Sequence, residues 1–182
     1  MIFVTVGTQL PFDRLVRTVD VWAARTKSEV FAQIGPGQYA PEHIRWTRTL
    51  PADECNSHIR HARAVVAHAG MGSILTALQY GKPIIVLPRR ASLGEHRNDH
   101  QVTTAKHFHE QGRIRVAFDE SELSRQLDEI ATLQPTARIA SVASPALIGA
   151  LRSFVQEAKR VASDGRTAQA ARPIADTAIA RA

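Results

Sequence analysis

The sequence contains little of what would mark several other classes of protein. Its 182 residues include a single cysteine, Cys55, so an intramolecular disulfide framework is excluded and a reducing compartment such as the cytoplasm is expected. No apolar run approaches the roughly 18 residues that a membrane-spanning helix requires. No basic region precedes the apolar segment 2–6, so we expect no signal peptide. These absences predict a protein that is soluble or peripheral to a membrane.

The sequence has fewer acidic than basic residues, and few aromatic residues. The chain has 23 Lys and Arg against 17 Asp and Glu, which gives a formal net charge of +6, and only 5% of its residues are aromatic. A basic protein favours anionic partners, among them nucleic acids, acidic lipids and phosphorylated substrates. Because the basic residues are scattered and no nucleic-acid-binding motif is present, we expect no nucleic acid partner. An anionic membrane surface accounts for the charge equally well.

Short apolar segments alternate with helical patterns along the first 133 residues. We expect strands at residues 2–6, 29–34, 44–47, 64–67, 84–87 and 114–118, and helices beginning near Pro11 and at residues 51–62, 71–80, 98–111 and 120–133. Continuous apolar strands separated by helices are typical of a sheet that is buried on both sides. The alternation therefore predicts an α/β fold, a Rossmann-like parallel sheet with helices on both faces.

The character of the sequence changes after residue 133. Residues 134–145 are rich in small side chains, 146–162 carry an amphipathic helical pattern, and 163–182 are rich in Ala and Arg without aromatic residues. We therefore predict a Rossmann-like domain at residues 1–133, a linker and C-terminal helix at residues 134–162, and a mobile tail at residues 163–182.

The segment 64–78 carries the strongest functional signal. An apolar strand, 64–67, runs into a turn containing Gly70 and Gly72, and a helical pattern follows. Glycines let a ligand approach the backbone, and the free N–H groups of a first helical turn attract phosphate. The turn lacks the Lys-Ser/Thr pair of a P-loop and the spacing of a dinucleotide fingerprint. It predicts a nucleotide or nucleotide-sugar site, although any sharp strand-to-helix turn could use the same glycines.

Three segments should meet at the carboxyl edge of such a sheet. They are 7–9 after the first strand, 68–73 at the glycine turn and 89–101 after the strand 84–87. The last segment begins with Arg89 and Arg90 and continues as an almost unbroken polar run. Many donors and acceptors in one loop suit a polyhydroxylated ligand such as a sugar, and the arginines suit a phosphate.

Each of these residues also has a structural interpretation. Gly7 can serve tight packing, Thr8 can cap the helix that begins near Pro11, and His68 can be a core histidine. Asn98 or Asp99 can cap the helix that follows them.

A metal site is not expected. His96 and His100 are four residues apart, a spacing that can hold a metal ion on a helix. However, no third ligand with suitable spacing accompanies them, and Cys55 is isolated in the sequence. We therefore expect neither a metal nor another cofactor.

Several separated motifs carry a family resemblance. They are 4–9 (Val-Thr-Val-Gly-Thr-Gln), 68–74 (His-Ala-Gly-Met-Gly-Ser-Ile), 81–83 (Gly-Lys-Pro) and 95–101 (Glu-His-Arg-Asn-Asp-His-Gln). In this order, within residues 1–133, they resemble the glycosyltransferase family 28 C-terminal domain, and especially the small catalytic subunits of two-component UDP-sugar transferases. The resemblance implies a fold equivalent to the C-terminal half of a GT-B glycosyltransferase, with residues 1–133 as the UDP-sugar-binding domain.

The resemblance also implies roles for individual residues. Gly7 and Thr8 would line the cleft, the turn Gly70, Met71, Gly72 and Ser73 would meet the diphosphate, and Asn98, Asp99, His100 and Gln101 would contact the donor sugar. We add His68 and Arg89 as ligand contacts because of their places at the same edge of the sheet.

One position departs from the family pattern. Thr76 stands where many relatives carry a glutamate that binds the ribose hydroxyls, and threonine is too short to bind a diol with two oxygens. Ribose recognition is therefore expected to fall to Glu95 or to a water molecule. The catalytic base stays open: His68, Glu95 and His96 are the candidates in this chain, whereas single-chain relatives supply the base from their acceptor half.

These inferences predict the donor-binding catalytic subunit of an inverting glycosyltransferase. It would move a sugar from a UDP-sugar to a polyprenyl-diphosphate-linked acceptor in exopolysaccharide or capsule synthesis. A membrane-associated partner subunit would carry the acceptor half and hold the enzyme at the cytoplasmic membrane face, and a homo-oligomer of the isolated chain is left open. The alternatives are a UDP-sugar epimerase- or hydrolase-like enzyme and a non-catalytic nucleotide-sugar-binding module.

Overall fold

The computed structural model describes residues 1–140, 142 and 145–156. The chain divides into two units, Met1–Ile139 and Ala140–Ala182. The predicted tail 163–182 and the end of the predicted helix, 157–162, lie outside the described residues.

The first unit is built on a six-stranded parallel sheet with the order β3-β2-β1-β4-β5-β6. The strands are β1 (Ile2–Thr5), β2 (Val30–Gln33), β3 (Arg45–Thr47), β4 (Ala64–His68), β5 (Ile84–Leu87) and β6 (Arg115–Val116). The chain builds outward from β1 to β3 and then returns to place β4 on the other side of β1. The strand order therefore reverses between β1 and β4, where an open sheet leaves a crevice at its carboxyl edge.

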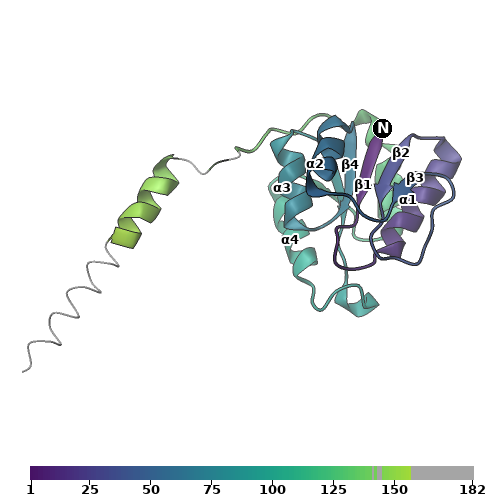
Figure 1. The fold of residues 1–182 in the computed structure, drawn as a ribbon, viewed down its shortest axis with the longest axis horizontal. Helices are drawn as coiled ribbons and strands as arrows, with labels where there is room; N and C mark the ends of the chain where they lie inside the picture. Colours follow the sequence, from purple (N-terminus) through teal and green to yellow (C-terminus); the bar gives the residue numbers. More distant parts are fainter. Residues whose placement is uncertain (141, 143–144, 157–182) are drawn as a thin grey trace, which may run out of the picture. The chain divides into compact units, whose positions relative to one another are not determined.

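Helices cover both faces of the sheet (Figure 1). On one face lie α1 (Asp13–Thr26) and α5 (Glu120–Asp128), and on the other lie α2 (Ala52–His61), α3 (Met71–Gln79) and α4 (His100–Glu110). Alternate strand residues point to opposite faces: Val4 of β1 packs in the cluster of α1 and α5, whereas Phe3 packs in the cluster of α2, α3 and α4. This arrangement confirms the predicted Rossmann-like parallel sheet.

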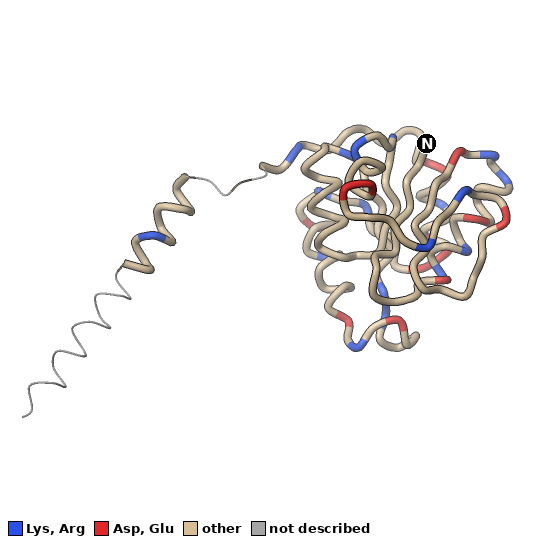
Figure 2. Tube along the Cα trace, in the orientation of Figure 1, with Lys and Arg blue, Asp and Glu red and all other residues tan. Residues whose placement is uncertain are grey.

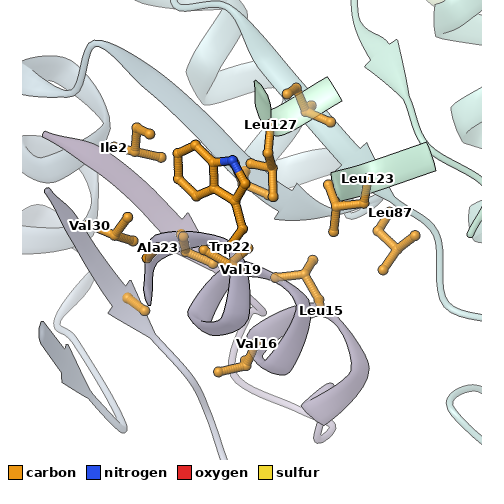
Figure 3. Packing of buried hydrophobic residues seen from close by; sticks show 14 of the residues in the cluster. Ile2, Leu15, Val16, Val19, Trp22, Ala23, Val30, Leu87, Leu123 and Leu127 are labelled. Carbon is orange, nitrogen blue, oxygen red and sulfur yellow. The ribbon is translucent and has the colours of Figure 1, made fainter. Parts of the chain in front are cut away.

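The packing under α1 shows how the core fixes these helices (Figure 3). Trp22 lies between the sheet and α5, close to Ile2 and Leu127, and is 4% exposed. Its indole N–H donates a hydrogen bond to the Asp128 carboxylate at 3.0 Å, so the polar end of the ring is also satisfied. The ends of α1 and α5 are thereby joined.

Some element boundaries differ from those expected. The predicted helix 120–133 ends at Asp128 and is followed by a 3₁₀ turn, Ile130–Thr132, whose tighter geometry places Ile130 in the core. The helix expected from residue 98 begins only at His100: the Asn98 amide donates to His96 Nδ1 and the Asp99 carboxylate accepts the Ala91 amide, both within the preceding loop. The expected strand 114–118 is reduced to Arg115–Val116.

Residues just after 133 are attached to the first unit. The Thr136 amide donates to the Gly81 carbonyl, the Ile139 amide donates to the Leu78 carbonyl, and the Ile139 side chain packs against the cluster of α2, α3 and α4. In the second unit, residues 145–156 are helical and expose Leu147, Ile148, Leu151, Phe154 and Val155.

Charged residues of both signs are interspersed along the trace of the first unit (Figure 2). Within the part of the chain that the structure describes, no helix combines the length and the apolarity that crossing a bilayer would require.

Candidate functional site

A cavity of about 650 Å³ lies at the carboxyl ends of β1, β4 and β5, where the strand order reverses. Its walls come from the β1–α1 loop, the start of α3, the loop after β5, and α2. The cavity is lined by these predicted binding residues and by the candidate base His96: Gly7, Thr8, His68, Gly70, Gly72, Ser73, Thr76, Arg89, His100 and Gln101. The three segments expected to converge therefore contribute to one cavity.

The β1–α1 loop is held in shape by a small hydrogen-bond network. Gly7 adopts a left-handed φ of 75°, and its amide donates to the Thr5 hydroxyl at 3.2 Å. The Thr5 hydroxyl donates to Gln33 Oε1 at 2.7 Å, and Gln33 Nε2 donates to the Gly7 carbonyl at 2.9 Å. Glycine is favoured here both by its φ and because an added Cβ would lie 2.8 Å from the His68 ring. The packing interpretation of Gly7 thus has a structural basis.

The buried side chain of Arg89 is hydrogen-bonded to the same loop. Its side chain is 3% exposed, and its Nη2 donates to the carbonyls of Val6 at 2.8 Å and Leu10 at 2.7 Å. Its guanidinium lies 4.8 Å from the centroid of the Phe12 ring. These acceptors are neutral, and among the described residues Nε has no hydrogen-bond partner. Arg89 is therefore not a solvated surface charge: it places a buried positive charge beside the cavity.

The buried position of Arg89 also affects its neighbour His68. Burial lowers the pKa of Arg89 to about 10, a value at which the guanidinium still carries its charge at neutral pH. Burial, together with the charge of Arg89, lowers the pKa of His68 to about 4, so this imidazole is neutral at pH 7. His68 Nδ1 is buried and has no partner among the described residues, while the ring forms part of the cavity wall.

The lowered pKa of His68 predicts a pH dependence of stability. Between pH 6.5 and 4 the unfolded chain protonates this imidazole and the folded chain does not, so the free energy of unfolding should fall as the pH falls. The shift in the pKa of His68 from 6.5 to about 4 corresponds to a loss of about 3 kcal/mol in the free energy of unfolding. Urea unfolding of the His68→Asn variant between pH 4 and 7 should show a flatter pH profile than the wild type. The same slope in both proteins would contradict the assignment, and His61→Asn, on an exposed histidine, is the control.

The start of α3 lies at the cavity, and its amides at 71–73 have no hydrogen-bond partner in the part of the chain that the structure describes. Gly70 is the N-cap and supplies no side-chain hydrogen bond, while Gly72 and Ser73 line the cavity. The first amides of a helix have no partner within the helix, and the helix dipole adds partial positive charge. Together with the charge on Arg89, these amides make this end of the cavity suited to an anion such as a diphosphate.

A profile of the Glycosyltransferase family 28 C-terminal domain matches residues 1–160. The chain belongs to this family. The resemblance seen in the motifs is thereby confirmed.

Curated relatives of this family 28 chain include a mammalian transferase subunit. The human UDP-N-acetylglucosamine transferase subunit ALG13 is 34% identical over 124 residues, which cover 62% of this chain and 10% of the human protein. The mouse protein of the same name is 32% identical over 123 residues, with the same coverage. The chain thus spans about a tenth of the length of these relatives.

Solved structures show the same fold. A solution NMR structure of ALG13 has a TM-score of 0.54 at 19% identity and covers 78% of this chain and 90% of that one. The kitacinnamycin glycotransferase has a TM-score of 0.55 at 20% identity and covers 72% of this chain and 35% of that one. Os79 from O. sativa in complex with UDP has a TM-score of 0.55 at 16% identity, with coverages of 71% and 31%. The fold is that of one half of a GT-B glycosyltransferase.

Four predicted binding residues do not line the cavity of the family 28 domain: Met71, Glu95, Asn98 and Asp99. The Glu95 carboxylate instead forms a two-point ion pair with Arg14 and accepts the Arg90 amide at 3.0 Å. With both oxygens engaged, Glu95 is not placed to bind ribose or to act as a base in this structure. Thr76 itself does line the cavity, from α3.

The other three residues make contacts or have exposure outside the cavity lining. The Asp99 carboxylate accepts the Ala91 amide at 2.8 Å, and Asn98 Oδ1 contacts the His100 ring. Asp99 is the N-cap of α4 by position but makes no side-chain capping bond. Met71 lies on the exposed side of α3, and its side chain is 47% exposed.

The wall formed by α2 was not predicted. It brings Ala52, Cys55, Asn56 and Ile59 to the cavity, next to Leu50 from the segment before the helix. These residues follow an ordinary amphipathic pattern, which gives no sign that one side of the helix faces a ligand cavity. Gln33 was also missed, although a polar residue at the end of an otherwise apolar strand was a signal for it.

Proposed function

We propose that this chain is the donor-binding subunit of a two-component inverting glycosyltransferase that uses a UDP-sugar. The observation that carries the proposal is the cavity at the reversal of the strand order, which is lined both by the start of α3 and by the buried side chain of Arg89. The family supports a glycosyltransferase, and the names of the human and mouse relatives support UDP-N-acetylglucosamine as one candidate donor. The same names describe a transferase subunit, which supports a partner chain.

The residues of the cavity suggest how the donor would be held. The amides of 71–73 and the charge on Arg89 would face the diphosphate, and His96, His100 and Gln101 would face the donor sugar. In the reaction an acceptor hydroxyl attacks the anomeric carbon from the opposite side, and the bond to the diphosphate oxygen breaks. Negative charge then grows on the diphosphate, where fixed dipoles and a buried cation stabilise it most. The proton of the attacking hydroxyl would go to a base from the acceptor half.

The acceptor and the location are further parts of the proposal. In a two-component enzyme the acceptor side of the cleft would come from a second chain, which we propose to be membrane-associated. We propose a polyprenyl-diphosphate-linked sugar as the acceptor, in exopolysaccharide or capsule synthesis at the cytoplasmic membrane face. The net charge of +6 would favour an anionic lipid surface.

Two measurements test this function in sequence. In calorimetric titrations UDP should bind the isolated chain, and a panel of UDP-GlcNAc, UDP-glucose, UDP-galactose and UDP-glucuronate should identify the donor. Transfer to a lipid-linked acceptor should then require the partner chain, with a rate at least 100-fold above that of either chain alone, because the reacting groups are otherwise not assembled. Full transfer by the isolated chain would contradict the split enzyme. Release of free sugar without an acceptor would identify a hydrolase instead.

A further inference from the structure

A shielded ion pair joins α1 to the loop after β5. Arg14, on the first turn of α1, donates from Nε to Glu95 Oε1 at 2.7 Å and from Nη2 to Glu95 Oε2 at 2.8 Å. The two side chains are only 11% and 13% exposed. Parallel double hydrogen bonds of this kind fix orientation as well as distance. The pair therefore sets the position of Glu95 relative to α1.

Further bonds tie Arg14 to the start of the same loop and to α5. Its Nη2 also donates to the Pro88 carbonyl at 3.1 Å, and its Nη1 donates to Glu120 at 3.2 Å. Glu95 Oε2 accepts the Arg90 amide, and the Glu95 amide donates to the Arg90 carbonyl at 3.2 Å. Residues 90 and 95 are thus bonded to each other, and Arg14 of α1 holds both Glu95 and the Pro88 carbonyl that precedes this segment.

The next residues of the chain enter the cavity. His96, His100 and Gln101 line it, whereas the Glu95 side chain does not. The amide oxygen of Gln101 accepts the Arg89 amide at 3.2 Å, so the far end of the loop is also anchored. Of the cavity-lining residues, His96 directly follows Glu95 in the chain and is therefore the one tied most closely to this ion pair.

We propose that Arg14 and Glu95 are a positioning pair that holds the cavity-lining residues His96, His100 and Gln101 in place for the sugar part of the donor. This inference rests on the proposed function. The pair should affect the sugar more than the diphosphate, because the hydrogen bonds of Arg89 to the β1–α1 loop are made without Arg14 or Glu95. Neither Arg14 nor Glu95 would touch the donor.

The test compares UDP with the UDP-sugar that binds the wild type most tightly. In Arg14→Met and in Glu95→Gln the affinity for the UDP-sugar should fall about tenfold, while the affinity for UDP stays within about twofold, because only the sugar-facing loop is released. The double variant should be no weaker than either single variant, because both remove the same interaction. Glu95→Gln keeps the shape of the side chain and one acceptor for the Arg90 amide, so it should stay folded where Arg14→Met does not.

Two further variants make the test specific. Arg14→Lys keeps the charge but cannot make the two-point bond, and it should behave like Arg14→Met. Arg25→Met removes the partner of Asp128 from an exposed ion pair at the other end of α1, and it should leave both affinities unchanged. Equal losses for UDP and the UDP-sugar, or no loss for either, would overturn the positioning pair. Failure of the wild type to bind UDP at all would instead overturn the proposed function.

Discussion

Replacing Gly72 with leucine should abolish UDP binding while the domain stays folded. Gly72 lines the cavity near the start of α3, and an added Cβ would meet no atom within 4 Å. A leucine there would project from the cavity wall across the α3 amides that are expected to hold the diphosphate. We expect the affinity for UDP to fall at least 100-fold, about 2.7 kcal/mol, in calorimetric titration. The melting temperature should not fall, since leucine is the better helix former.

Two other glycines serve as controls for this experiment. Gly149 lies in the helix 145–156 and also has open space around its Cβ position, so Gly149→Leu should bind UDP as the wild type does. Gly70 differs, because an added Cβ there would overlap the His68 ring, and Gly70→Ala should lower the melting temperature. Wild-type affinity for UDP in Gly72→Leu would show that the diphosphate does not sit at the start of α3.

The fold could be predicted from the sequence because the signals for it are local. Apolar strands such as 84–87 stand between clear helix-stop and loop residues, and β5 has the bounds that the pattern indicates. The predicted end of α5, at residue 133, was wrong because of a tertiary contact. Residues 129–133 are compatible with a helix, but packing of Ile130 into the core favours a 3₁₀ turn.

The location of the cavity could also be predicted, since in a parallel sheet the loops after the strands share one edge. The roles of single side chains in it could not, because their partners are distant in the sequence. Glu95 pairs with Arg14, 81 positions away, and Arg89 binds the Val6 carbonyl, 83 positions away. In the sequence, Glu95 belongs to a polar run that suggests ligand contact, and only the structure shows that its carboxylate is already engaged.

Replacing Arg89 with methionine should separate function from stability. The variant loses two hydrogen bonds to the Val6 and Leu10 carbonyls, at a cost of about 1 to 3 kcal/mol. It also removes a buried charge, whose pKa of about 10 corresponds to about 2 to 3 kcal/mol of unfavourable burial once solvent screening is considered. These opposing terms are similar in size, so urea unfolding at pH 7 should show a change of less than about 1 kcal/mol.

The affinity of Arg89→Met for UDP should nevertheless fall about 100-fold, because the buried charge acts on the diphosphate in a region shielded from water. Arg89→Lys keeps a charge but cannot reach both carbonyls in the same way, and we expect an intermediate loss of about tenfold. Calorimetric titration of the wild type, Arg89→Met and Arg89→Lys with UDP would distinguish a role in ligand binding from a role in holding the β1–α1 loop. If Arg89→Met unfolded readily but bound UDP normally at low temperature, Arg89 would serve only the β1–α1 loop. A buried cation that contributes little to stability and much to binding is what an anion site requires.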